Sequence, residues 1–369
     1  MLIAAQRLLT PDGLGPGWVE IEAERIASVG AGVPPRPADE TFDLVSPGFV
    51  DVHSHGGGGV NFADGVGPAR EVLAMHRAHG TTTMQASLVT GALDALQSEV
   101  VALTPLVEAG ELAGIHLEGP WLAEQYKGAH EAALLRDPVL ADVQRLAGAG
   151  PVRLVTIAPE RAGAMESIAW LAGQGVVVAV GHTAADDATT RAAIAAGATG
   201  ATHLFNAMPE LTHRAPGPSL PLWESPDVWV ELISDGVHVA SDLVAHVMVT
   251  KPDRCVLVTD AMAAAGVGDG DYTLGNLAVE VRDGVARLAG QATIAGSTLT
   301  LDRAVRVAVG AGVPLELALR AATCHPADYI GLPGVGRLGA GCFADLVVLD
   351  DGLNVTRVMR RGEWLAHLS

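Results

Sequence analysis

The pattern that decides the fold begins with an apolar run ending in two histidines, Pro47-Gly48-Phe49-Val50-Asp51-Val52-His53-Ser54-His55-Gly56. Its β-branched and aromatic residues favour a buried strand. Residues i and i+2 of a strand project from the same face, so His53 and His55 direct their imidazoles to one point. Such a pair suits a divalent transition metal, although a purely structural pair of histidines explains this motif about equally well when it is taken alone.

From about residue 49 to 262, short apolar runs alternate with Ala-rich amphipathic stretches, which predicts repeated β/α units around a parallel sheet. Eight strands are expected, at Phe49–His55, Thr81–Ser87, Gly114–Glu118, Val152–Ala158, Val176–His182, Gly200–Phe205, Trp229–Asp235 and Cys255–Asp260. Helices are expected between and after them, at Ala69–His79, Ala92–Ala109, Glu131–Ala149, Ala185–Ala196, Leu299–Ala311 and Leu315–Thr323. This order predicts an α/β fold, a (β/α)8 TIM-type barrel.

The two ends of the chain carry short alternating segments separated by Gly and Asp turns, namely Trp18–Ile21, Asp345–Leu349 and Val355–Met359. Neither end is large enough to form a stable sheet alone. We therefore expect residues 1–48 and 335–369 to join in one small β-sandwich domain beside a barrel domain of residues 49–334. A hairpin is expected after the eighth strand, at Leu277–Val281 and Val285–Leu288.

Composition limits the class of partner. The chain has 369 residues, 49% of them hydrophobic and 18% charged, and a formal net charge of −19. Nucleic acids and anionic membranes need basic surface, so neither is an expected partner, whereas an anionic small molecule can still bind a local cationic pocket. The N-terminus lacks the pattern of a secretory signal and no stretch is typical of a spanning helix, so a cytoplasmic protein is expected. The three cysteines lack CxxC spacing and are expected to be buried free thiols.

Potential metal ligands stand at the ends of five of the eight expected strands. In a TIM barrel the active site forms at the carboxyl ends of the strands. Each such residue taken alone is explained about as well by a helix cap or a loop hydrogen bond. Six imidazole or carboxylate groups that meet on one rim need a compensating cation, so the sequence predicts a metal centre from His53, His55, Glu118, His182, His203 and Asp260.

Other histidines and glycines have simpler interpretations. His238 follows the seventh strand and is expected to contact substrate, whereas His116 and His325 are expected to be structural. His76 and His79 are expected on a solvated helix face. The run Gly56–Gly59 lacks the spacing of a phosphate loop, and we expect it to let a loop pass close to the metal and substrate.

These motifs resemble those of the amidohydrolase superfamily, and one family within it in particular. The segments at 47–56, 116–122 with 127–130, 180–183, 202–208, 234–238, 258–262 and 295–305 read PGFVDVHSHG, HLEGPWL with KGAH, VGHT, THLFNAM, SDGVH, VTDAM and AGSTLTLDRAV. Together they resemble the N-acetylglucosamine-6-phosphate deacetylase family over essentially the whole chain. The resemblance implies hydrolysis of N-acetyl-D-glucosamine 6-phosphate to D-glucosamine 6-phosphate and acetate, in amino-sugar catabolism or cell-wall sugar recycling. It also implies a homodimer in which the neighbour completes part of the phosphate site.

The same resemblance implies roles for the ligands. Glu118, His182 and His203 would hold the principal metal, and His53 and His55 a second site that only some members have. Asp260 would be the catalytic acid/base, with metal ligation as a further role. One or two divalent ions per subunit are implied; zinc is the expected metal, and such ligands also accept Fe, Mn, Co or Ni. The only lysines, Lys127 and Lys251, stand outside strand ends, so a carboxylated lysine ligand is not expected.

The implied mechanism passes a proton through Asp260, which takes it from water during attack on the acetamide and returns it to the departing amine. His238 would stabilise the oxyanion or orient the carbonyl. The residues implied to contact the phosphosugar are Ala129, Asn206, Ala207, Arg214, His238, Ile294, Ala295 and Gly296. The alternatives are another metal-dependent amidohydrolase, acting on a cyclic amide or dipeptide, and a non-catalytic scaffold, which the complete ligand set disfavours.

Overall fold

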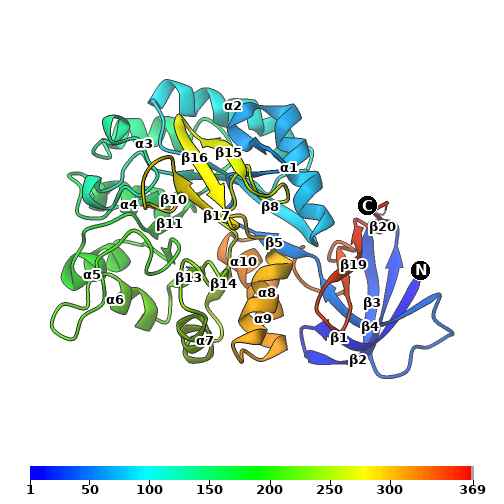
Figure 1. Cartoon of the computed structure of the whole chain (residues 1–369). Helices are drawn as coiled ribbons and strands as arrows, with labels where there is room; N and C mark the ends of the chain where they lie inside the picture. The colour runs from blue at the N-terminus through cyan, green and yellow to red at the C-terminus, as the bar shows by residue number, and fades with distance from the viewer. Residues whose placement is uncertain (367–369) are drawn as a thin grey trace.

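The computed structural model describes residues 1–366, and a parallel barrel sheet is at its centre (Figure 1). In these residues the sheet has eight strands in the order β5-β8-β9-β10-β11-β12-β13-β14. Their bounds are β5 (Phe49–Asp51), β8 (Thr81–Val89), β9 (Gly114–Glu118), β10 (Val152–Ile157), β11 (Val177–Val180), β12 (Gly200–Ala201), β13 (Trp229–Leu232) and β14 (Cys255–Leu257). Just beyond β5 and β14 a parallel bridge joins Ser54 to Ala261. The expected TIM-type fold is therefore confirmed, and its ring closes at the end where the strands finish.

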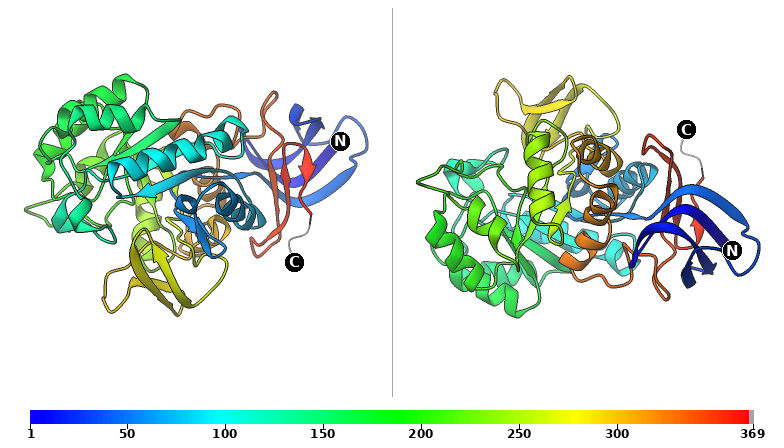
Figure 2. Two further views of the ribbon diagram at one scale, coloured as in Figure 1. Left: turned by 90° about the horizontal axis from the view of Figure 1, so that it is seen from above. Right: turned by 90° about the horizontal axis from the view of Figure 1, so that it is seen from below.

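Helices cover the outside of this sheet (Figures 1 and 2). They are α1 (Val66–Ala78), α2 (Leu93–Glu108), α3 (Leu140–Ala147), α4 (Ala164–Gly173), α5 (Asp187–Ala195), α6 (Ser219–Glu224), α7 (Ser241–Thr250), α8 (Leu301–Gly310), α9 (Leu315–Ala321) and α10 (Cys324–Tyr329), with short turns η1 (Phe62–Asp64), η2 (Glu124–Tyr126) and η3 (Ala132–Leu134). The long helix expected at Glu131–Ala149 was wrong, because Pro138 disfavours helical backbone at the residue before it and cannot donate a helical hydrogen bond. Only η3 and the short α3 form there.

The two ends of the chain lie side by side next to the barrel, as the blue and red strands of Figure 2 show. Within residues 1–366 they form a seven-stranded sheet, in the order β20-β19-β18-β4-β1-β2-β3. The bounds are β1 (Leu2–Thr10), β2 (Gly13–Glu22), β3 (Arg25–Ala31), β4 (Glu40–Pro47), β18 (Leu346–Leu349), β19 (Val355–Arg360) and β20 (Glu363–Trp364). Antiparallel pairing of β4 with β18 joins the N-terminal and C-terminal segments.

This terminal sheet has its own hydrophobic core. Ile21 and Ile26, near one end of the strand order, share that core with Leu346 and Met359, near the other end. A bridge between Arg25 and Phe343 also brings the two ends together. The sheet therefore folds over onto itself as a sandwich does, although its strands are hydrogen-bonded as one sheet. The domain boundaries at 48/49 and 334/335 stay a prediction, and residues 367–369 of the expected C-terminal segment lie outside the described residues.

A smaller antiparallel sheet stands off the barrel between β14 and α8, drawn yellow in Figures 1 and 2. The described chain gives it three strands, β15 (Gly270–Leu274), β16 (Leu277–Arg282) and β17 (Val285–Leu288), in sequence order. The predicted hairpin forms its second and third strands. Isolated bridges hold residues 294–297 between this inserted sheet and the barrel, since Ile294 pairs with Arg287 and Ser297 with Ala261. A minor pair, β6 (Gly56–Gly57) and β7 (Val60–Asn61), follows β5.

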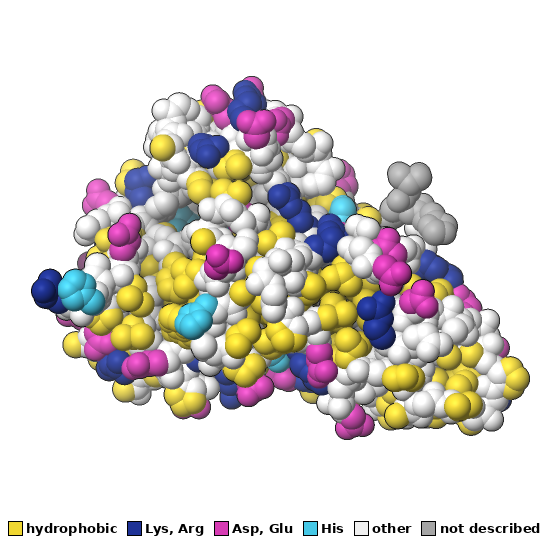
Figure 3. All heavy atoms as spheres, turned by 60° about the horizontal axis from the view of Figure 1, so that its bottom comes forward, with side chains coloured by type: hydrophobic (Ala, Val, Ile, Leu, Met, Phe, Trp, Pro, Cys, Tyr) yellow, Lys and Arg dark blue, Asp and Glu magenta, His cyan; other side chains and the backbone are white. Residues whose placement is uncertain are grey.

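The molecular surface mixes charges of both signs. On the face drawn in Figure 3, Lys and Arg side chains are interspersed with Asp and Glu side chains and with hydrophobic patches. Among residues 1–366, no helix combines the length and the apolar character that a bilayer crossing requires. Cys255 is buried as expected, whereas Cys324 and Cys342 are partly exposed, and all three thiols are free.

Candidate active site

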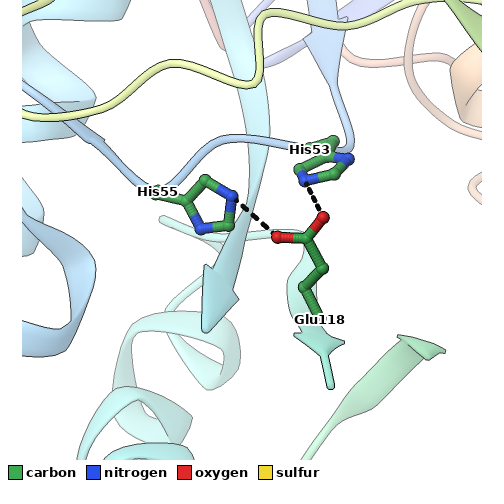
Figure 4. Close-up of side chains that lie close together, drawn as sticks. All are labelled: His53, His55 and Glu118. Atoms are coloured by element: carbon green, nitrogen blue, oxygen red, sulfur yellow. Dashed lines mark ion pairs between the residues drawn. The ribbon is translucent and has the colours of Figure 1, made fainter. Parts of the chain in front are cut away.

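Glu118, the last residue of β9, is the centre of a buried polar cluster. Its Oε1 lies 3.1 Å from the Nε2 atoms of both His182 and His203. Its Oε2 lies 3.1 Å from Nε2 of His55, and Oε1 lies 3.4 Å from Nε2 of His53; Figure 4 shows the carboxylate between these two rings. The strand ends therefore bring the predicted ligands into one place.

The hydrogen bonds of His182 assign its proton. Its Nδ1 lies 2.9 Å from the carbonyl oxygen of Tyr126, which can only accept, so Nδ1–H donates and Nε2 carries a lone pair. The Nε2 of His203 lies 3.0 Å from that same atom. Two imidazole nitrogens and a carboxylate oxygen thus converge on one point, as the ligands of a metal ion do. The donor set of imidazole and carboxylate fits a divalent metal of the zinc type.

The backbone at these positions is unusual. The residues His182, His203 and Asp260 have positive φ angles of 47°, 28° and 49°. Left-handed backbone is uncommon outside glycine, and it persists where the surrounding structure enforces it, often at functional sites. It also explains why β11, β12 and β14 end before the residues predicted to finish them. The departure from strand geometry places the side chains of the three residues at the rim.

His55 and His53 face a second part of the cluster. His55 Nδ1–H donates to the carbonyl oxygen of Ser87 (3.2 Å), so its Nε2 faces Glu118 and also Asp260 Oδ1, at 3.1 Å. His53 Nε2 lies 3.5 Å from Asp260 Oδ1. Burial lowers the pKa of both imidazoles, but the Glu118 and Asp260 carboxylates outweigh it: the pKa of His55 is raised to about 9 and that of His53 well above its usual value. These positions therefore favour a cation.

Asp260 combines burial with a strongly acidic character. Burial raises its pKa, but the positive potential of His53 and His55 dominates and holds that pKa well below the ordinary value. A second carboxylate, that of Asp51, holds the segment next to Asp260 in place. Asp51 Oδ2 accepts from Thr259 Oγ1 (2.6 Å), and Asp51 Oδ1 accepts from the backbone N–H of His53 (3.3 Å). Asp260 is therefore an ionised carboxylate on a rigid support, as an acceptor of protons must be.

A pocket of about 350 Å³ opens over the cluster. Most of the predicted site residues line it, namely His55, Glu118, Ala129, His182, His203, Asn206, Ala207, His238, Asp260, Ile294 and Gly296. His238 enters from the loop after β13, where Asp235 Oδ2 accepts from its Nδ1–H at 2.6 Å. Burial lowers the pKa of His238, but this hydrogen bond and the charge of Asp235 outweigh it, so the net pKa is raised.

Three predicted residues lie elsewhere. The ring of His53 is fully buried beneath the pocket, and Ala295 is buried in the core of the inserted sheet. Arg214 is exposed and does not line the pocket of this chain. Its loop lies outside the barrel core, so the phosphate role implied for it needs a neighbouring subunit or a different loop position.

The expectation about His76 was wrong, and the glycine run has a contact that the sequence did not indicate. Residues 56–59 do not line the pocket; a Cβ on Gly57 would lie 2.2 Å from Met75 and 3.0 Å from His76 Nε2, so this glycine lets the loop approach α1. His76 is fully buried, not solvated, and its Nε2–H donates to the carbonyl oxygen of Gly56 (3.0 Å). Burial lowers the pKa of His76 to about 4. The helix spacing did not reveal that α1 turns this residue inward.

Several residues that shape the site had no role predicted from the sequence. His130 accepts from the backbone N–H of Thr90 (3.3 Å) through Nδ1, so its Nε2–H points to Glu118 Oε2, 3.5 Å away. Tyr126 and Leu274 also line the pocket, the latter from the inserted sheet. His130 ends the KGAH motif and was therefore detectable, whereas Leu274 has no local signal because only tertiary packing brings it here.

The structure agrees with two other expectations. His116 is buried below Glu118, between Ser87 Oγ and Thr156 Oγ1, each 2.9 Å from a ring nitrogen. Lys127 donates to the carbonyl oxygens of Gly128 and His130, and Lys251 to those of Trp223 and Ser225. Both lysines therefore donate to backbone carbonyl oxygens, and the candidate metal ligands are imidazoles and carboxylates.

Comparisons with known proteins agree with this arrangement. The model of the Amidohydrolase family matches residues 44–365. N-acetylgalactosamine-6-phosphate deacetylase of Escherichia coli O157:H7 is 37% identical over 98% of each chain, and human N-acetylglucosamine-6-phosphate deacetylase is 39% identical over 89% of this chain and 86% of its own. The structure of a mutant N-acetyl-D-glucosamine-6-phosphate deacetylase from Mycobacterium smegmatis, in complex with N-acetyl-D-glucosamine-6-phosphate, is 51% identical with a TM-score of 0.96 and covers 99% of this chain and 98% of its own.

Proposed function

The chain belongs to the amidohydrolase family, and from that premise we propose that it is a metal-dependent deacetylase of N-acetyl-D-glucosamine 6-phosphate. The products are D-glucosamine 6-phosphate and acetate. The observation that carries the proposal is the convergence of His182, His203 and Glu118 beside Asp260 at the floor of the pocket. The likeness to the Mycobacterium smegmatis deacetylase, at 51% identity over nearly the full length, supports the substrate.

The metal centre is proposed from the donor set. Glu118, His182 and His203 would hold the principal ion, with His53 and His55 as the second site, and zinc is the proposed metal. A divalent ion in such a site supplies a Lewis acid that acidifies water and polarises a carbonyl. The protein supplies the geometry: Tyr126 and Ser87 carbonyl oxygens fix the tautomers of His182 and His55.

Asp260 is proposed as the acid/base. Its low pKa keeps the carboxylate ionised, the form that can accept a proton from water, and its partners His53 and His55 hold it toward the cluster. The proton then passes to the departing amine as the tetrahedral intermediate collapses. His238, held by Asp235, is proposed to orient the acetamide carbonyl or stabilise its developing negative charge.

The rest of the pocket is proposed to bind the phosphosugar. Asn206, Ala207 and Ala129 would receive the phosphate end, and Ile294 and Gly296 the sugar, since these residues line one continuous pocket. Ala295 would contribute through its backbone because its side chain is buried behind the wall. We propose that Arg214 completes the phosphate site of a neighbouring subunit in a homodimer, and that the enzyme works in the cytoplasm.

The test is a rate comparison. The enzyme should deacetylate N-acetylglucosamine 6-phosphate with a kcat/KM far above that for unphosphorylated N-acetylglucosamine, and equal values would contradict the phosphate assignment. N-acetylgalactosamine 6-phosphate is the second candidate substrate, favoured by the likeness to the Escherichia coli O157:H7 relative. Assaying the two phosphosugars side by side ranks them. A cyclic amide or dipeptide hydrolysed faster than both would replace the proposal with the runner-up, a different metal-dependent amidohydrolase.

A further inference from the structure

A carboxylate lies inside the barrel below the metal cluster, at Glu231 of β13, and its side chain is fully buried. Its Oε2 accepts from His53 Nδ1–H at 2.9 Å and from the backbone N–H of His203 at 3.4 Å. Its Oε1 accepts from the hydroxyl of Tyr329, also at 3.4 Å. Glu231 therefore contacts two predicted metal ligands from the side that faces away from the pocket.

The barrel is built to admit this network. Tyr329, from α10, reaches Glu231 past Gly200 of β12, where a Cβ would lie 2.0 Å from the tyrosine hydroxyl. A buried carboxylate costs several kcal/mol of desolvation, and well-packed apolar residues of similar volume are often as stable. A glutamate at this place therefore needs a reason beyond packing, and its shortest contact points to His53.

The contact fixes the state of the His53 ring. A carboxylate oxygen only accepts, so Nδ1 carries a proton and Nε2 is the nitrogen left to face the cluster. That atom is buried and has no hydrogen-bond partner among residues 1–366. It points at Glu118 Oε1 and Asp260 Oδ1, 3.4 and 3.5 Å away. Between two carboxylates this nitrogen carries a proton or binds a metal cation, and a divalent ion can take the place of the proton.

The other rings are oriented differently. His55 and His182 donate their Nδ1–H groups to backbone carbonyl oxygens, of Ser87 and Tyr126. Only His53, in the described chain, donates to a carboxylate from below the cluster. A charged partner raises the basicity of an imidazole ligand more than a carbonyl does, and loss of such partners costs 10–100-fold in metal affinity.

We propose that Glu231 is a positioning residue for a second metal ion. It locks the tautomer and the ring plane of His53 so that Nε2 serves as a ligand together with His55 and the shared carboxylates Glu118 and Asp260. The inference rests on the metal-dependent function proposed above and assigns a determinant of how many ions the centre holds. The hydroxyl of Tyr329 holds the Glu231 carboxylate in place by a hydrogen bond to its other oxygen.

The test is a count of bound metal in the full-length protein. Wild-type protein and E231Q are stripped with chelator, titrated with Zn²⁺ and, separately, with Co²⁺, whose visible absorption reports ligation. The wild type should bind two equivalents. E231Q should keep the first and bind the second about 10–100-fold more weakly. D345N is the matched control, because Asp345 is a buried carboxylate of the terminal sheet that accepts from the backbone N–H of Arg361 and lies outside the site.

The outcomes separate the hypotheses. A single equivalent in wild type, two equivalents at unchanged affinity in E231Q, or loss of both ions in E231Q but not in D345N would each overturn the proposal. If E231Q does not fold, H53Q and the H53Q/E231Q double variant replace it, since in the double variant the two side-chain amides can hydrogen-bond to each other. These two variants should bind metal equally if Glu231 acts through His53. A further loss of metal affinity in the double variant would refute the proposal. Deacetylase turnover is measured on the same samples. If the second ion depends on Glu231 but the wild type turns over no phosphosugar, the positioning role stands and the proposed function is refuted.

Discussion

The Nε2 atoms of His182 and His203 lie 3.0 Å apart, and each is 3.1 Å from the same oxygen of Glu118. Metal binding to such a site should stabilise the folded state, since the unfolded chain does not preform it. At a free Zn²⁺ concentration 100-fold above Kd, the gain is about 2.7 kcal/mol. We expect the Tm of chelator-treated protein to rise when Zn²⁺ is added, measured by differential scanning fluorimetry. H182Q should lose most of this rise, and an equal rise in that variant would place the metal elsewhere.

Replacing the proposed acid/base should separate binding from chemistry. D260N keeps the shape of the pocket but cannot accept a proton, so kcat should fall by about 10²–10⁴-fold. Binding of N-acetylglucosamine 6-phosphate, measured by calorimetry, and the first equivalent of metal should remain. D345N serves as the control with near wild-type turnover. A D260N enzyme with wild-type kcat would assign the proton transfer to another group.

The pair formed by Asp235 and His238 gives stability a pH dependence. The pKa of His238 is raised by this contact, so the charged pair contributes fully below the unfolded pKa of about 6.5 and is lost as pH rises through the folded pKa. The unfolding free energy lost in D235N should therefore be greater at pH about 6 than at pH about 9. Urea denaturation of metal-free protein at both pH values measures it. A difference that grows with pH would contradict the pairing.

Arg214 offers a test of the subunit arrangement, because it is exposed and does not line the pocket of its own chain. If it binds phosphate across a dimer interface, R214A should raise the KM for N-acetylglucosamine 6-phosphate about tenfold or more, with little change in kcat. Unphosphorylated N-acetylglucosamine should be unaffected. R303A removes an exposed arginine of α8 and is the matched control. Light scattering should give a dimer, and a monomer with unchanged KM in R214A would remove this role.

The sequence predicted the barrel, and the meeting of the candidate ligands, because both follow from the order of strands along the chain. Strand ends of a parallel barrel meet at one rim, so Glu118, His182, His203 and Asp260 could be placed together from their position after apolar runs. The left-handed backbone that takes three of them out of strand geometry could not be foreseen, since non-glycine residues rarely adopt it.

What the sequence missed depends on contacts between distant segments. Glu231 occurs within an apolar strand with no motif of its own, and its role emerges only when β5 and α10 bring His53 and Tyr329 to it. Leu274 reaches the pocket because the inserted sheet packs over it. His76 is buried because α1 turns it toward Gly56. Spacing along one element gives no information about such tertiary contacts.

The pairing of the two chain ends has a consequence for how the protein is made. Pro47 of β4 pairs with Leu346 of β18, about 300 residues later. At roughly 5–20 residues per second, a ribosome needs on the order of 15–60 s to synthesise the partner strand. During that interval β4 has an unpaired edge of the kind that recruits other chains. The nascent chain therefore exposes this edge to other chains through most of its synthesis, until β18 emerges and pairs with β4.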